Sequence, residues 1–268
     1  MMVCKRCGTE FSDGFFCPEC GMKMATEYDR EKYGPQGELE EQKITQNIRL
    51  AGIKMVFENK ILILEQDIIA EGNTDLEFQN CKFVVSNKAR IQIRGENVSI
   101  RFRNCCFEGK ENVVWCHFGS NNINSSRIKV IFQNSAFILG GTGKEEEDFL
   151  LKMCGNIYFE NCFINRQKIC KLAWEKSRSE LEFQKCIIFD GKTCGPQNYA
   201  DSLIYAKNAV VKFNNCFIRS FRKLVDDGSI SSNIHSNPDS NIHTWSAMLK
   251  RMTENTLSES SASMLIVK

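Results

Sequence analysis

The sequence lacks any apolar run long enough to cross a membrane, since no stretch of about 18 consecutive apolar residues occurs. It also lacks a secretory signal, because the first seven residues read MMVCKRC, without an apolar core. The formal net charge is only +2, which gives no strong overall attraction to nucleic acid or to anionic membranes. With 42% hydrophobic and 25% charged residues, the chain is predicted to be a soluble, cytoplasmic protein.

Recognisable catalytic patterns are also scarce. The three histidines, His117, His235 and His243, show no spacing typical of a catalytic triad. The glycine-rich stretch from Gly140 to Lys144 lacks the glycine spacing of a phosphate-binding loop and the Ser or Thr after its lysine. The sequence therefore singles out no catalytic residue and favours a protein that is not an enzyme.

The sequence instead repeats one eight-residue pattern, which we call the kernel. Each kernel alternates two apolar residues with polar ones, passes a corner residue that is usually Asn, and then alternates again in the opposite phase. The Phe of the first half recurs every 21 to 30 residues. The kernels occupy residues 55–62, 76–83, 100–107, 130–137, 157–164, 181–188 and 211–218.

A repeat that tolerates insertions but keeps its kernel is typical of stacked coils. The change of phase at Asn marks a corner, because Asn adopts left-handed backbone more readily than other non-glycine residues. Corner Asn side chains on coils about 4.8 Å apart can then hydrogen-bond in a ladder. Over residues 50–220 the pattern resembles the right-handed parallel β-helix of the pectate-lyase-like superfamily. We expect an all-β fold of about seven coils, the number of kernels; the alternative, an antiparallel sandwich, does not repeat one kernel.

Four cysteines near the start of the chain form the most specific motif. Cys4 with Cys7, and Cys17 with Cys20, make two Cys-x-x-Cys-Gly turns, and four thiolates suit tetrahedral zinc without an open position. The motif looks like a short zinc ribbon and predicts one structural zinc ion. A redox dithiol would need a thioredoxin-like βαβ context, which is absent. Docking to a partner and simple stabilisation remain open as roles for this module.

The remaining cysteines are better explained as core residues than as disulfides. Five of the 14 cysteines fall at the same inward kernel position, and Ser135 replaces the sixth. A small buried thiol fills a core well in a reducing compartment, which again favours the cytoplasm. The five are Cys81, Cys105, Cys162, Cys186 and Cys216.

Composition divides the chain into four parts. The acidic linker is expected to cap the open first coil, with a short helix at its end. Thr244 is expected to begin a helix over residues 244–254, and the stretch before it is either a polar loop or a poor final coil. The four parts are a zinc ribbon (1–24), a linker or cap (25–47), a β-helix (48–225) and a C-terminal loop, helix and tail (226–268).

Between kernels each coil has a further strand. Its outward residues are Gln92 and a mixture of basic and aromatic side chains. Such a stripe suits an extended anionic polymer, either a polysaccharide or a nucleic acid. In pectate-lyase-like enzymes this sheet forms the substrate groove, but the acidic calcium cluster of the lyases is not found here. A solvated face is the simpler explanation. The residues of this ligand stripe are Arg94, Trp115, His117, Lys152, Lys171, Tyr205 and Lys207.

A second set of outward residues is apolar. It lies between the inward Cys and the inward Phe or Ile of successive kernels, and it is too contiguous to leave in water. We expect a C-terminal lid to cover it, because Trp245, Met248, Leu249 and Met252 form a matching helical stripe; a side-by-side homodimer is the alternative. This outer column consists of Cys106, Ala136, Phe163, Ile187 and Phe217.

Three functions remain open from the sequence. The leading hypothesis is a zinc-binding β-helix that acts as a binding or scaffold module for another protein. A carbohydrate-active lyase or hydrolase on an acidic polysaccharide is the second, and a nucleic-acid-binding protein that uses the ribbon and the ligand stripe is the third.

Overall fold

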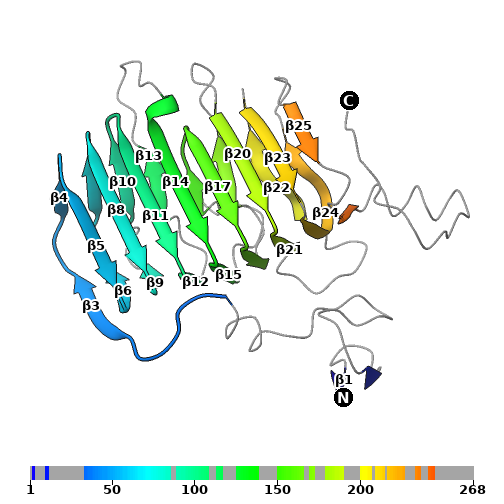
Figure 1. Cartoon of the computed structure of the whole chain (residues 1–268), viewed down its shortest axis with the longest axis horizontal. Coiled ribbons are helices and arrows are strands. Elements are labelled where there is room, and N and C mark those ends of the chain that lie inside the picture. The colour runs from blue at the N-terminus through cyan, green and yellow to red at the C-terminus, as the bar shows by residue number, and fades with distance from the viewer. Residues whose placement is uncertain are drawn as a thin grey trace, which may run out of the picture.

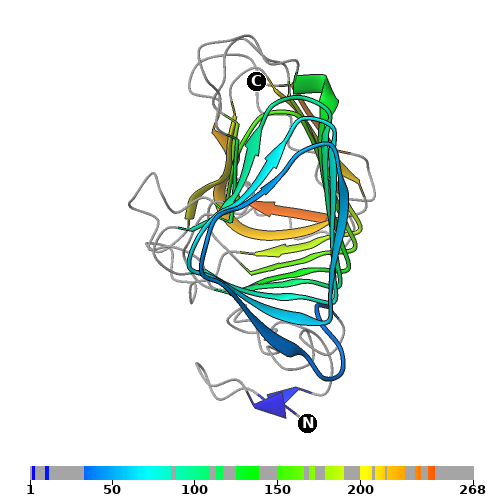
Figure 2. The same cartoon turned by 90° about the vertical axis from the view of Figure 1, so that its left-hand side faces the viewer.

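The structure is a computed structural model of the whole chain. It describes residues 2–3, 10–11, 33–85, 89–108, 113–116, 125–138, 150–165, 169–172, 179–189, 200–206, 209–214, 216–226, 233–236 and 241–244. Within these residues the protein is a parallel β-solenoid, as predicted, with three strands to a turn (Figure 1). Figure 2 shows the three faces around a common interior.

Every solenoid turn contributes one strand to each face. The first face contains the strands between kernels: β4 (Ile48–Leu50), β7 (Ile68–Glu71), β10 (Ile91–Arg94), β13 (Val114–Cys116), β16 (Leu151–Lys152), β19 (Cys170–Leu172) and β22 (Ala200–Ala206). The second face contains the first half of each kernel: β5 (Lys54–Glu58), β8 (Thr74–Gln79), β11 (Val98–Arg103), β14 (Ile128–Gln133), β17 (Asn156–Glu160), β20 (Ser179–Gln184), β23 (Ala209–Asn214) and β25 (Asn233–Ser236).

The third face contains the second half of each kernel. The long strand β24 also pairs with β22, so the first and third faces join into one 16-stranded sheet. The strands of the third face are β3 (Glu40–Ile44), β6 (Lys60–Leu64), β9 (Lys82–Val85), β12 (Cys106–Glu108), β15 (Ala136–Ile138), β18 (Phe163–Asn165), β21 (Ile187–Phe189), β24 (Phe217–Asp226) and β26 (Asn241–Thr244).

The solenoid has about five turns, fewer than the seven coils expected from the kernels. The first kernel lies in an end turn, β4–β6, whose strands β4 and β5 each pair with another strand on one side only. A count of kernels therefore overestimates the number of turns that are stacked on both sides.

The corner between the second and third faces forms where the change of phase predicts it. Asn59, Asn80, Asn104, Asn134 and Asn161 all have positive φ, between 49° and 56°. Asn80 Nδ2 donates to Asn59 Oδ1 at 2.7 Å, and Asn161 Nδ2 donates to Asn134 Oδ1 at the same distance. These bonds are links of the predicted ladder.

A second corner, between the first and second faces, was not predicted. Asn73 and Asn97 have φ of 58°, and Asn97 Nδ2 donates to Asn73 Oδ1 at 2.9 Å. Gly155 occupies the equivalent turn further along with φ of 116°. The signal is short, because only two asparagines mark this corner among the described residues.

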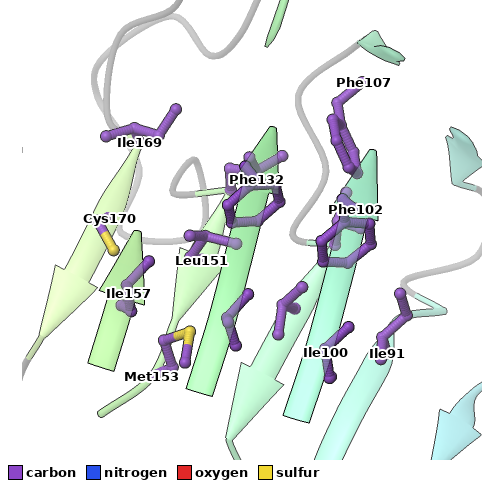
Figure 3. Close-up of a cluster of buried hydrophobic side chains, with 14 of the residues drawn as sticks. Ile91, Ile100, Phe102, Phe107, Phe132, Leu151, Met153, Ile157, Ile169 and Cys170 are labelled. Atoms are coloured by element: carbon purple, nitrogen blue, oxygen red, sulfur yellow. The ribbon is translucent and has the colours of Figure 1, made fainter. Parts of the chain in front are cut away.

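The core consists of columns of like residues, one from each turn. Phe102, Phe132 and Phe159 stack with ring centroids 4.7 Å apart. A second column, which includes Phe107 and Phe137, meets the first edge to face (Figure 3). Burial of each ring contributes about 1.5–3 kcal/mol, so this repeated stacking holds the turns in register. The first column comprises Phe57, Phe78, Phe102, Phe132, Phe159, Phe183 and Phe213.

The expected helices are not found in the described residues, where the only helical segment is the 3-10 turn η1 (Ser125–Arg127). The cap helix was a wrong prediction: residues 40–44 form β3, which pairs with β6 and continues the third face. Thr244 is the last residue of β26, and the rest of the predicted C-terminal helix lies outside the described residues. Within the described ranges, no helix is long and apolar enough to span a membrane.

Candidate functional site

Part of the ligand stripe follows a single line across the first face, and Arg94 is not on this line, because Gln92 is the residue in register with Trp115. Strand register places Lys152 beside Trp115 on one side and beside Lys171 on the other, and Lys171 lies beside Tyr205. The Lys171 ammonium sits 5.5 Å from the centroid of the Tyr205 ring. His117 and Lys207 lie outside the described residues. The structure therefore brings three basic or aromatic side chains into adjacent turns, at the spacing of the strands.

Arg94 belongs to a polar network at the other end of this face. Its Nε and Nη2 donate to Gln92 Oε1 at 2.8 and 2.6 Å, and Gln92 Nε2 donates to the Asp67 carboxylate. The other Asp67 oxygen accepts the Arg90 backbone N–H at 2.9 Å. This network fixes the guanidinium above the sheet. Asp67 was missed in the sequence because it lies in a turn and not in a strand.

The outer column forms one line on the third face, also in register. Cys106 pairs with Ala136, Ala136 with Phe163, Phe163 with Ile187, and Ile187 with Phe217. Cys106, Ala136 and Phe163 are at most 5% exposed, although they point away from the core. Another segment therefore covers them.

The cover is a segment from the predicted linker, Tyr33–Gln36, which we call the strap. Tyr33 is only 3% exposed and stacks on Phe163 with ring centroids 5.8 Å apart and planes inclined by 23°. Gly34 N–H donates to the carbonyl of Asn134 at 3.0 Å. The Gln36 N–H donates to Asn80 Oδ1 at 2.6 Å, and Asn80 Nδ2 donates to the Gln36 carbonyl at 2.7 Å.

Gly34 lets the strap lie close to the sheet. Its φ is +99°, which side-chain-bearing residues rarely adopt, and a Cβ there would lie 3.5 Å from Cys106 Cβ and 3.7 Å from Ala136 Cβ. The strap thus occupies part of the surface for which a C-terminal lid was expected, while residues 245–254 of that lid lie outside the described residues. Only the tyrosine and glycine before Pro35 distinguish the strap from an ordinary linker in the sequence.

The inward cysteines form a column behind the Asn corner. Each described thiol of this column contacts the carbonyl two residues before it and a carbonyl of the preceding turn, as Cys162 does with Glu160 at 3.3 Å and Phe132 at 3.5 Å. Burial raises the pKa of the Cys105 and Cys186 thiols. Cys116, Cys154 and Cys170 are further buried cysteines outside any disulfide that the kernel pattern did not reveal.

We expect Cys162→Ser to be mild and Cys162→Leu to be costly. A serine hydroxyl can donate to the Glu160 carbonyl, as Ser135 donates to Gln133 O at 2.9 Å in its own turn. A leucine must instead push the close-packed turns apart, with a loss of about 1–3 kcal/mol. Urea unfolding of both variants measures this, and an equal loss in the two would contradict a tightly packed column. Native thiol labelling should also be slow at all five kernel cysteines.

The second face carries a depression of about 260 Å³ that the sequence did not suggest. Tyr158 lies in it, with the Lys129 ammonium 5.3 Å from the centroid of its ring. Partial burial and the charges of Glu180 and Glu182 raise the pKa of Tyr158. The carboxylates that line it are engaged, since Gln133 Nε2 donates to Glu160 at 2.7 Å and Asn214 Nδ2 donates to Glu182 at 2.7 Å.

No metal centre appears in the described part of the chain, where no group of three or more His, Cys, Asp or Glu residues is placed to hold a metal ion. The four cysteines of the predicted ribbon lie outside it. Two strands flank the first pair of them: β1 (Met2–Val3) and β2 (Glu10–Phe11) pair antiparallel. Cys4 and Cys7 fall between these strands in the sequence.

Comparison of the chain with protein-family models, with curated proteins and with solved structures finds no match. Its function is therefore inferred from its own residues.

Proposed function

We propose that this chain is a non-enzymatic binding or scaffold protein whose partner is another protein. The observation that supports this proposal is the strap, because the outer surface of the solenoid holds a peptide segment through backbone hydrogen bonds and one aromatic contact. These are the contacts with which proteins recognise peptides. The flat faces of a solenoid offer further area of the same kind.

In this proposal the chain has two modules, a zinc ribbon and a solenoid. Cys4, Cys7, Cys17 and Cys20 hold one structural zinc ion in a ribbon, and the solenoid behind it is a β-helix of the pectate-lyase-like architecture. The antiparallel pairing of β1 with β2 supports a hairpin across the first cysteine pair. The nine cysteines outside any disulfide among the described residues support a reducing, cytoplasmic location.

Zinc analysis together with cross-linking of the full chain tests this proposal. We expect about one zinc ion per chain, and chelation should abolish the ribbon while the β-sheet circular dichroism stays. Cross-links should join lysines on the solenoid faces to one reproducible protein partner. Turnover of a polyuronate, or a chain without zinc, would contradict the proposal.

A second candidate function, binding of an anionic polymer, has its own support. The aligned side chains of Lys152, Lys171 and Tyr205 combine two positive charges with an aromatic ring on adjacent turns. Phosphates, sulfates and uronates are the anions that such a stripe suits. This candidate predicts binding that weakens steeply as the salt concentration rises.

Charge reversal tests this stripe. If the stripe binds a polyanion, Lys152→Glu and Lys171→Glu should each weaken binding to heparin and to single-stranded DNA, and each should reduce the salt slope by about one unit. Lys43→Glu is the control, because it makes the same change of charge at an exposed lysine on β3 of the third face, away from the stripe. Equal effects of all three changes would indicate non-specific attraction and exclude the stripe as a site.

A further inference from the structure

The surface beneath the strap has the features of a peptide-binding groove. Its floor is the outer column, which presents one small or apolar side chain from each turn: Cys106, Ala136 and Phe163. One wall is the corner ladder, whose Asn80 and Asn134 face the strap with hydrogen-bonding groups. Floor and wall both belong to the rigid solenoid, so they do not depend on the strap for their shape.

Most hydrogen bonds between the groove and the strap are made to the backbone of the strap. Asn80 accepts from the Gln36 N–H and donates to the Gln36 carbonyl, which is the pairing that an edge strand offers. The Asn134 carbonyl accepts the Gly34 N–H. These contacts are made by backbone groups and not by side chains of the strap, so they provide affinity with little regard to its side chains.

Selection for sequence comes from two adjacent positions of the strap. The first requires an aromatic ring, because Tyr33 stacks on Phe163 and is almost fully buried by it. The second favours glycine, because the φ of +99° at Gly34 disfavours other residues and the backbone lies against Cys106 and Ala136. An aromatic residue followed by glycine is therefore the pattern that fits.

The groove extends beyond the strap. Ile187 is the next residue of the outer column after Phe163 and packs against the same apolar cluster, but it is only half-buried. Phe217 follows in register. A segment longer than the strap has more apolar floor to cover than the strap itself uses.

We propose that the outer column is a peptide-docking groove, that the strap is its resident ligand, and that the protein partner enters with a segment carrying an aromatic residue followed by glycine. This inference rests on the proposed function and names the chemistry of the partner. The tethered strap competes at an effective concentration of the order of millimolar, so the groove stays closed until a better ligand arrives. Contacts with Ile187, which the strap leaves half-buried, let the partner bind the groove more tightly than the strap does.

The experiment uses the full chain and a fluorescent peptide of residues 32–39, KYGPQGEL. A Tyr33→Ala/Gln36→Pro double variant releases the strap, because it removes the ring and the N–H that Asn80 binds. Fluorescence anisotropy should show that this variant binds the peptide at least about tenfold more tightly than the wild-type chain does. Peptides with Ala for the tyrosine, or Val for the first glycine, should bind about tenfold more weakly.

Three results would overturn the inference. They are no binding by a double variant whose circular dichroism is native, equal binding by the wild-type chain and the variant, and equal binding of the three peptides. The proposed function is tested separately, because its readout is a cross-linked protein partner and not the binding of the strap peptide. A partner captured equally by the wild-type chain and by a Phe163→Ala variant would uphold the scaffold and exclude the groove.

Discussion

Replacement of Gly155 by alanine is expected to lower the free energy of unfolding by about 3 kcal/mol or more. Gly155 turns the chain between β16 and β17 with φ of +116°, where side-chain-bearing residues are strained. An alanine Cβ would also lie 2.7 Å from the Ile128 carbonyl oxygen and 2.9 Å from Ile128 Cβ. Because the nearest atom is backbone, a change of side-chain rotamer cannot relieve the clash.

Urea unfolding followed by circular dichroism measures this effect, with Gly37→Ala as the control. Gly37 also has positive φ, at +75°, but nothing lies within 4 Å of the position that its Cβ would take. Its replacement should cost only the backbone strain, about 1–2 kcal/mol. Similar losses for Gly155→Ala and Gly37→Ala would show that the contact with Ile128 is relieved and not rigid.

Phe132→Ala is expected to lower the free energy of unfolding by about 3–5 kcal/mol. Phe132 is fully buried in the middle of the longest aromatic column and stacks on Phe102 and Phe159 with centroids 4.7 Å away. Its ring also meets Phe137 edge to face at 5.3 Å. Removal of the ring leaves a cavity that rigid parallel strands cannot close. The loss of unfolding free energy should therefore lie near the upper end of this range.

Ile131→Ala on the same strand is the matched control for Phe132→Ala. Ile131 precedes Phe132 on β14 but faces outward and is partly exposed, so its loss should change stability by about 1 kcal/mol or less. The stabilities of the two variants are compared from their urea midpoints, provided that the dependence of the unfolding free energy on urea concentration is unchanged. A Phe132→Ala variant as stable as Ile131→Ala would contradict the stacked column as the source of the solenoid's stability.

The kernel predicted the fold because it contains local information that is repeated. Alternation fixes which side chains face inward, so the positions of Phe132 and Cys162 followed from parity alone. The positive φ at Asn134 followed from the change of phase in its kernel. The same parity placed Lys152 and Lys171 on one outward line, since parallel strands in register align equivalent residues.

The strap was not predictable in the same way. Tyr33 and Phe163 are 130 positions apart, and no repeat or periodicity connects them. The sequence indicated that the outer column needs a cover, but burial is a property of the assembled surface and does not identify the covering segment. An amphipathic pattern drew attention to the C-terminal residues, whereas the strap uses one ring and backbone groups, which leave almost no pattern in a sequence.

Contacts between distant residues also explain the other differences between the structure and what the sequence predicted. Residues 40–44 include Glu, Gln and Lys, which suit a short helix, yet pairing with β6 makes them a strand. Tertiary pairing overrides local propensity there, because the edge of the third face needs a partner. The polar network of Asp67 and Gln92 joins a turn to a strand one turn away, and such contacts depend on which turns stack.

Hydrogen exchange at the strap tests the central claim most directly, because both the proposed function and the groove depend on a peptide held against the outer column. The amides of Gly34 and Gln36 donate to Asn134 and Asn80, so they should exchange slowly in the wild-type chain. In the Tyr33→Ala variant these amides should exchange fast, while the strands of the solenoid remain protected. Fast exchange of both amides in the wild-type chain would contradict the account.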